Sequence, residues 1–190
     1  MSAISSTITL KFCGLCQWAH TVWVIHRTFE DNLNEEAIRK RIRCPYVLND
    51  MSTITQEYVL LQIAKLHDPA VQNDRNNLTI DYVIRFGGWD NGTLSKLRAL
   101  ESKLNELRQK IKPARNKILS HNDLETILNN MVLGDFAKDA DKEYFENLQK
   151  FVDIIHDKVI GGPYPLEDSM ANNDAKTLVD VVMGRIALLY

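Results

Sequence analysis

The sequence predicts an all-α protein, a helical bundle of roughly five to seven helices. The first observation is a shortage of turn-forming residues: the chain has 8 Gly and 5 Pro among 190 residues, or about 7%, where average usage gives about 12%. Folds built from short strands need more of these residues than that. The second is that apolar residues recur mostly at helical spacing between the Gly and Pro clusters. A chain of this length with 45% hydrophobic residues supports one core without disulfides, so we predict a single domain over 1–190.

The first helices follow from apolar spacing. Apolar residues four, three and four positions apart mark one face of a helix, Trp18, Val22, Ile25 and Phe29. Residues 54–66 carry a wide apolar stripe that suits a bundle core. Residues 78–86 remain open between strand and helix, because β-branched and aromatic residues are mixed there.

The strongest helical pattern covers residues 93–112. Leucines and an isoleucine recur between charged residues, close to a heptad seam, at Leu94, Leu97, Leu100, Leu104, Leu107 and Ile111. Thr93 or Ser95 is expected to cap this helix after the Asn91–Gly92 turn. Two further helices are predicted at 145–159, ended by the glycines at 161–162, and at about 174–189.

Charge is balanced overall and uneven locally. The formal net charge is −2, which does not by itself indicate a nucleic-acid-binding protein. Residues 35–43 include a short basic run, and residues 123–153 are predominantly acidic. The main basic run is Lys96, Arg98, Lys103, Arg108, Lys110, Lys112, Arg115 and Lys117. It indicates either solvated helix faces or, if the bases share one face, a stripe that follows phosphates.

The cysteines and histidines suggest little chemistry of their own. Three cysteines and no secretory signal pattern predict a cytoplasmic protein in a reducing environment. Cys13 and Cys16 are expected to be buried thiols on an apolar helix; a zinc site using them with His20 and Cys44 stays open. His67 follows a helix end, where the helix dipole favours a histidine, and Pro69 stops the helix. Protease, nucleotide-loop, esterase and dinucleotide motifs are absent from the sequence.

One segment carries candidate chemistry, Arg115-Asn116-Lys117-Ile118-Leu119-Ser120-His121-Asn122-Asp123. Pro113 suits the first turn of a helix, and Asn122 followed by Glu125 resembles a capping box, so a helix is expected to break and restart beside His121. A purely structural interpretation pairs Arg115 with an acid on a neighbouring helix and leaves His121 to stabilise that break.

Two segments resemble the HEPN superfamily. The stretch RNKILSHND is similar to its Arg-x(4–6)-His motif, in the form with a polar residue after the Arg. Upstream, LLQIAKLHDPAVQNDRNNLTIDYVI at 60–84 resembles the abortive-infection-type (AbiU-like) branch of HEPN proteins. The resemblance covers about residues 15–160. It implies a HEPN-like helical bundle, in which Arg115 and His121 match the two named motif positions and Asn116 the accessory polar position. Lys112, Lys117, Ser120 and Asp123 are weaker, substrate-binding candidates.

The resemblance implies a metal-independent endoribonuclease without a cofactor, acting as a toxin or antiphage effector. Its partners would be RNA, a second copy of the chain and a cognate antitoxin, with no membrane. The residue types suit that chemistry, because histidine transfers protons near neutral pH and arginine stabilises charge on phosphate oxygens. One histidine cannot easily serve as base and acid in the same step, so a symmetric partner would supply the second. The alternative is a non-catalytic dimeric HEPN module that binds RNA or a partner protein.

Overall fold

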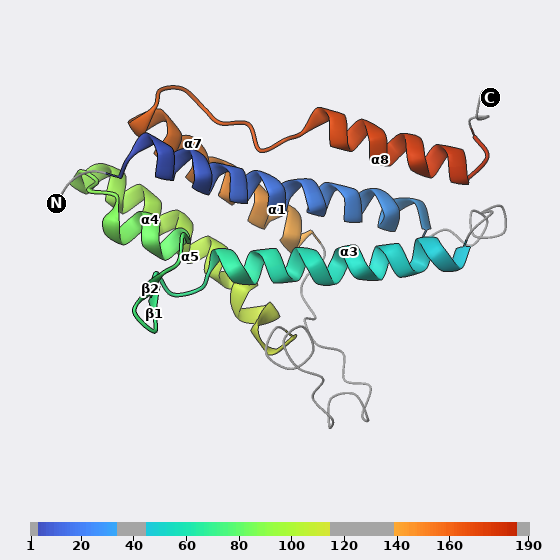
Figure 1. Cartoon of the computed structure of the whole chain (residues 1–190), viewed down its shortest axis with the longest axis horizontal. Coiled ribbons are helices and arrows are strands. Elements are labelled where there is room, and N and C mark those ends of the chain that lie inside the picture. Colours follow the sequence, from blue (N-terminus) through green and yellow to red (C-terminus); the bar gives the residue numbers. More distant parts are fainter. Residues whose placement is uncertain (1–3, 34–44, 115–138, 186–190) are drawn as a thin grey trace. The chain divides into compact units, whose positions relative to one another are not determined.

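Six helices and one small hairpin make up the part of the chain that the computed structural model describes, residues 4–33, 45–114 and 139–185 (Figure 1). The prediction of an all-α fold is confirmed. The elements are α1 (Ser6–Leu33), α3 (Pro45–Leu66), β1 (Val71–Gln72), β2 (Arg75–Asn76), α4 (Ile80–Phe86), α5 (Asn91–Ala114), α7 (Ala140–Val159) and α8 (Ser169–Val182). None of the helices within these ranges combines the length and hydrophobicity needed to cross a membrane.

The chain divides into two compact units, Met1–Cys16 with Leu60–Leu166, and Gln17–Val59 with Glu167–Tyr190. In the first unit α5 lies along α7. Its core is formed by side chains from the start of α1, the end of α3, α4, α5 and α7. The most deeply buried members include Phe12, Ile63, Ile80, Leu97, Leu104, Ile111, Leu148, Phe151 and Ile155. Whether the whole chain behaves as one domain stays a prediction.

The second unit has its own apolar cluster. Phe29 of α1, Leu48 of α3 and Val179 of α8 are buried together. Half-buried apolar residues from the same helices and from the C-cap of α8 pack against them, Ile25, Met51, Val182 and Met183. Each of α1 and α3 therefore contributes one part of its length to each unit.

Residues 78–86, left open by the sequence, contain a helix. The hydroxyl oxygen of Thr79 accepts a hydrogen bond from the backbone N–H of Tyr82 at 3.3 Å and so caps α4. Just upstream, Asn73 and Asp74 adopt positive φ values of 48° and 61° between the paired strands. A two-residue hairpin turn of this kind needs positive φ at both positions. The sequence analysis did not predict this hairpin.

The start of α5 differs from the prediction. The helix begins at Asn91, and Asp90 caps it, because its carboxylate accepts hydrogen bonds from the N–H and the hydroxyl of Thr93 at 2.8 and 2.7 Å. These bonds hold the pKa of Asp90 down to about 2, with a smaller contribution from Lys158. The Asn91–Gly92 pair therefore lies in the first turn of the helix, and capping by Thr93 or Ser95 was wrong.

Three other helix ends also differ from the prediction. Pro113 lies inside α5 and is followed by helical Ala114, so the helix predicted to begin at Pro113 does not begin there; the buried seam through Ile111 holds the chain helical into this turn. α8 starts earlier than predicted, because Asp168 accepts hydrogen bonds from two backbone N–H groups. It ends at Val182 rather than near 189, with Gly184 at a left-handed φ of 68°.

Replacing Thr79 by valine is expected to lower the free energy of unfolding by about 1 kcal/mol, because the cap of α4 is lost while the shape of this buried side chain is nearly kept. Urea denaturation measures the change. The matched control is Thr177→Val on the exposed surface of α8, where the hydroxyl donates only to the carbonyl of Asn173 within the helix. Equal stabilities of the two variants would contradict the capping role.

Candidate functional site

The described part of the chain ends just before the candidate motif and contains one of the predicted site residues. Lys112 lies near the end of α5, exposed to solvent. The other predicted site residues lie outside the described ranges, namely Arg115, Asn116, Lys117, Ser120, His121 and Asp123. What the structure defines is therefore the helix that leads directly into the motif and the surroundings of its last turns.

The rotation of α5 about its axis is fixed by its apolar seam. Leu97, Leu104, Leu107 and Ile111 are all at most 4% exposed, and α7 is the main element against which α5 packs. The heptad-like spacing of these residues thus serves the core of this unit. With the seam fixed inward, the positions of the polar residues around the helix are determined as well.

The basic residues of α5 do not share one face. At 100° per residue, they divide into two groups on opposite sides of the buried seam. One flank carries Lys96, Lys103 and Lys110, and the other carries Arg98, Arg108 and Lys112. A single phosphate-following stripe over the whole helix is therefore excluded for its described part. The second flank meets a concave surface, through Arg108 and Lys112.

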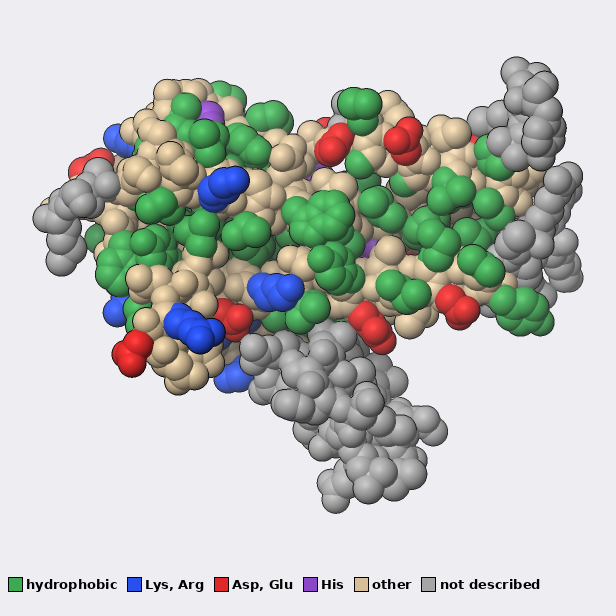
Figure 2. Space-filling model, in the orientation of Figure 1, with side chains coloured by type: hydrophobic (Ala, Val, Ile, Leu, Met, Phe, Trp, Pro, Cys, Tyr) green, Lys and Arg blue, Asp and Glu red, His purple; other side chains and the backbone are tan. Residues whose placement is uncertain are grey.

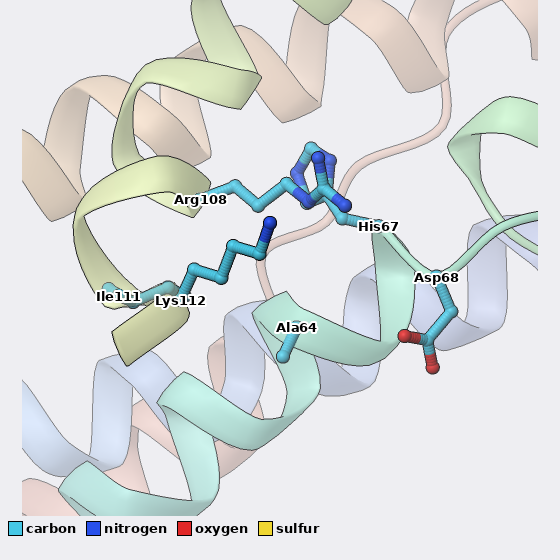
Figure 3. Close-up of a pocket in the computed structure, with 6 residues that line it drawn as sticks. All are labelled: Ala64, His67, Asp68, Arg108, Ile111 and Lys112. Atoms are coloured by element: carbon cyan, nitrogen blue, oxygen red, sulfur yellow. The ribbon is translucent and has the colours of Figure 1, made fainter. Parts of the chain in front are cut away.

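A concavity of about 330 Å³, counted with its open mouth, lies between the end of α3 and the last turns of α5. Its walls are Ala64, His67, Asp68, Arg108, Ile111 and Lys112 (Figure 3). The guanidinium of Arg108 and the ammonium of Lys112 extend toward the same space beside the His67 ring, whereas the Asp68 carboxylate points away from them. Arg108 and Lys112 are one helical turn apart.

His67 forms a buried wall of the concavity. Its Nε2 lies 3.1 Å from the hydroxyl of Tyr144 on α7, and the residue is 8% exposed. Burial, together with a smaller contribution from the charge of Arg108, lowers the pKa of His67 to about 3. The imidazole is therefore neutral at pH 7. The expectation that a charged histidine here interacts with the helix dipole was wrong, because the side chain points into the protein.

The segment after His67 is held in place by hydrogen bonds to Asp81 of α4 and to Asn77, which follows β2. The carboxylate of Asp81 accepts a hydrogen bond from the backbone N–H of Ala70 at 2.9 Å, and the side chain of Asn77 donates to the carbonyl of Pro69 at 2.9 Å. The backbone N–H of Asn77 also donates to the carbonyl of Ala70 at 2.8 Å. The Asp-Pro turn and the polar stretch after it thus fix the end of α3 that carries His67.

The cysteines of α1 are buried free thiols, as predicted. Burial raises the pKa of Cys13 to about 11 and that of Cys16 well above its usual range, so both stay protonated at neutral pH. Within the described residues no group of three or more His, Cys, Asp or Glu side chains is arranged to hold a metal ion. Cys44, the fourth ligand considered for zinc, lies outside those residues.

Sequence reasoning did not single out Arg108 or His67 as members of a site. Arg108 was one of eight bases in a run, and only its four-residue spacing from Lys112 indicated a shared face. His67 was assigned to a helix end. The signal that identifies both is their convergence on one concavity from segments about forty residues apart, which spacing along one helix does not reveal.

The family of the chain follows from a comparison with family models. The model HEPN_AbiU2, described as AbiU2, matches residues 8–178. This span contains α3, the concavity, α5 and the whole segment from Arg115 to His121. Neither the curated proteins nor the solved structures contain a match to the chain. The match to most of the chain, together with the helical fold, agrees with the resemblance of residues 60–84 and of the Arg-x(4–6)-His segment. The chain belongs to the AbiU2 family of HEPN proteins.

Proposed function

We propose that the protein is a HEPN-type, metal-independent endoribonuclease that cleaves RNA by attack of the 2′-OH on the adjacent phosphate. The observation that carries the proposal is the family match over residues 8–178, because it spans the Arg115 and His121 pair at the family's motif spacing. The electropositive concavity directly before the motif supports it, since RNA is the polyanion that such a surface would bind.

The motif supplies the two groups that this reaction needs. RNA carries its own nucleophile, so catalysis requires proton transfer and stabilisation of charge on the phosphate. His121 is the proposed proton-transfer residue. Arg115 would donate two hydrogen bonds to the phosphate oxygens as negative charge develops on them. Asn116 is proposed as the accessory polar residue, while Lys112, Lys117, Ser120 and Asp123 would contact substrate.

A homodimer would complete the site. A cleavage step needs a base for the 2′-OH and an acid for the leaving oxygen, and one His121 supplies only one of them. A two-fold axis brings the same residue from a second copy to the same place. Cellular roles consistent with the family are those of an abortive-infection effector or a toxin, with a cognate antitoxin as its partner.

Purified protein is expected to cleave RNA in the presence of EDTA, and His121→Ala is expected to lower the cleavage rate by about 10²-fold or more, the usual contribution of general acid–base catalysis. Arg115→Ala should have a comparable effect, because the phosphate charge is then unbalanced. Product formation on a denaturing gel measures both. The control is Arg75→Ala, which removes the same charge from the exposed hairpin. Unchanged cleavage by His121→Ala would refute the assignment of that residue.

A non-catalytic dimeric module is the second candidate, and exposed hydrophobic side chains of the second unit favour it. Tyr46 and Ile54 of α3 are 85% and 64% exposed, and Met170 of α8 is 76% exposed. Figure 2 shows hydrophobic side chains along the surface of α3, with few charged ones among them. This candidate predicts RNA or protein binding without RNA products. A chain that is monomeric by analytical ultracentrifugation would contradict both this module and a site shared between two copies.

A further inference from the structure

We propose that the concavity between α3 and α5 binds a backbone phosphate of the RNA, through Arg108 and Lys112, immediately before the catalytic motif. This inference rests on the proposed function for the identity of the ligand as RNA. The binding site itself follows from the side chains that converge there and from their charges, as Figure 3 shows.

The first argument is an uncompensated charge. Within the described residues, neither Arg108 nor Lys112 forms an ion pair within 4 Å, although both line the same concavity. Asp68 is the only acid among the six residues of the wall, and its carboxylate is directed away from both cationic groups. Glu101 lies close enough to Arg108 to interact electrostatically, but forms no ion pair with it.

The second argument concerns the wall behind the cations. The ring of His67 is buried and bonded to Tyr144, and its low pKa keeps it neutral near Arg108. Ala64 and Ile111 provide an apolar surface on the other sides. Charges that are partly removed from water interact more strongly with an anion than fully exposed ones do. A half-buried Arg108 with its neutral neighbour is thus better suited to a phosphate than the exposed lysines of the opposite flank.

The third argument is position. Lys112 is three residues before Arg115 in the chain, and Arg108 is one turn earlier on α5. Consecutive phosphates along a single strand extend over several ångströms per nucleotide, so a strand reaching the motif needs contacts beside it as well as at it. The fork of Arg108 would hold two oxygens of one phosphate, and the ammonium of Lys112 would contribute a second charge.

The test measures RNA binding separately from cleavage. The full chain carrying His121→Ala is titrated against a short fluorescein-labelled single-stranded RNA by fluorescence anisotropy, over about 50 to 200 mM salt. Adding Arg108→Gln and Lys112→Gln together should weaken binding about five-fold at 0.1 M salt. It should also reduce the salt slope by about 0.7, the value for one phosphate contact with a single strand.

The matched control is Lys103→Gln with Lys110→Gln, which removes the same two charges from the opposite flank of α5. This control pair should change the RNA affinity and its salt dependence clearly less than the Arg108→Gln and Lys112→Gln pair does. Equal losses from the two pairs would overturn the subsite, because only the net charge would then matter. Thermal unfolding of every variant confirms that it is folded.

Three further outcomes separate the ribonuclease proposal from the phosphate-binding proposal. If wild-type protein cleaves RNA but the Arg108 and Lys112 pair leaves binding unchanged, the subsite is wrong and the ribonuclease proposal stands. If wild-type protein does not cleave RNA and the pair still weakens binding selectively, the ribonuclease proposal fails and the subsite stands. Thermal stabilisation by inorganic phosphate that the pair abolishes, with RNA binding unaffected, would assign the concavity to free phosphate and overturn its role in RNA binding.

Discussion

Lowering the pH from 7 to 4 is expected to destabilise the protein by about 3 kcal/mol through His67 alone. Its pKa is lowered from 6.5 to about 3 in the folded protein, first by burial and then by Arg108. Between these two values the unfolded chain binds a proton that the folded chain does not. Stability therefore falls as the pH falls through this window, and rises with pH in the opposite direction.

The groups around His67 determine how the experiment is designed. Tyr144 contacts the ring from α7, while Arg108 from α5 and the neighbouring Asp68 line the same concavity. Urea denaturation of wild type and of His67→Gln at pH 7 and pH 4 isolates the titration, since all other groups are shared. We expect the loss of stability between the two pH values to be about 3 kcal/mol smaller in the variant. An identical pH dependence in both proteins would show that His67 titrates normally.

Replacing Phe151 by alanine is expected to lower the free energy of unfolding by about 3–5 kcal/mol, the usual cost of removing a buried aromatic ring. Phe151 is fully buried on α7, with its ring centroid 6.0 Å from that of Phe12 on α1. α5 packs against the same helix, so a cavity here weakens the core that fixes the rotation of α5. For a domain of this size the unfolding temperature should fall by about 10 °C, which differential scanning calorimetry measures.

Two controls distinguish the loss of a core contact from the general effect of removing an aromatic ring. Phe151→Leu retains most of the volume and should cost about 1.5 kcal/mol or less. Phe86→Ala removes a ring that is 39% exposed and is expected to cost about 1 kcal/mol. If Phe151→Ala were no more destabilising than Phe86→Ala, the contact between α1 and α7 would not be part of the stabilising core.

Helices marked by a glycine cluster at their end or by regularly spaced apolar residues were predicted well. Glycine clusters end helices through backbone conformations that other residues avoid, and Gly161 and Gly162 do adopt positive φ after α7. The seam of α5 was recognised because its apolar residues repeat at helical spacing over five turns. Helix starts were predicted less well. A cap depends on one hydrogen bond, and Asp90 and Thr93 are both residues that commonly form it.

The residues of the candidate site also fall into two groups, those predicted from the sequence and those recognised only in the structure. Arg115, Asn116 and His121 were found by their spacing and by the family resemblance, and their roles stay a prediction. Lys112 was found beside them. Arg108 and His67 were not recognised as members, because helical spacing does not show which side of α5 meets the end of α3.

The helical fold and the family could be predicted from the sequence alone, because residue types and short-range spacing carry that information. The same spacing marks the Arg115 to Asp123 segment as the candidate site, which stays a prediction. That His67 is buried and neutral, and that the bases of α5 divide between two flanks, follows from how the helices pack. His67 meets Tyr144 77 positions away in the chain. Burial and electrostatic surroundings come from such distant segments brought together by packing, and local spacing carries no information about them.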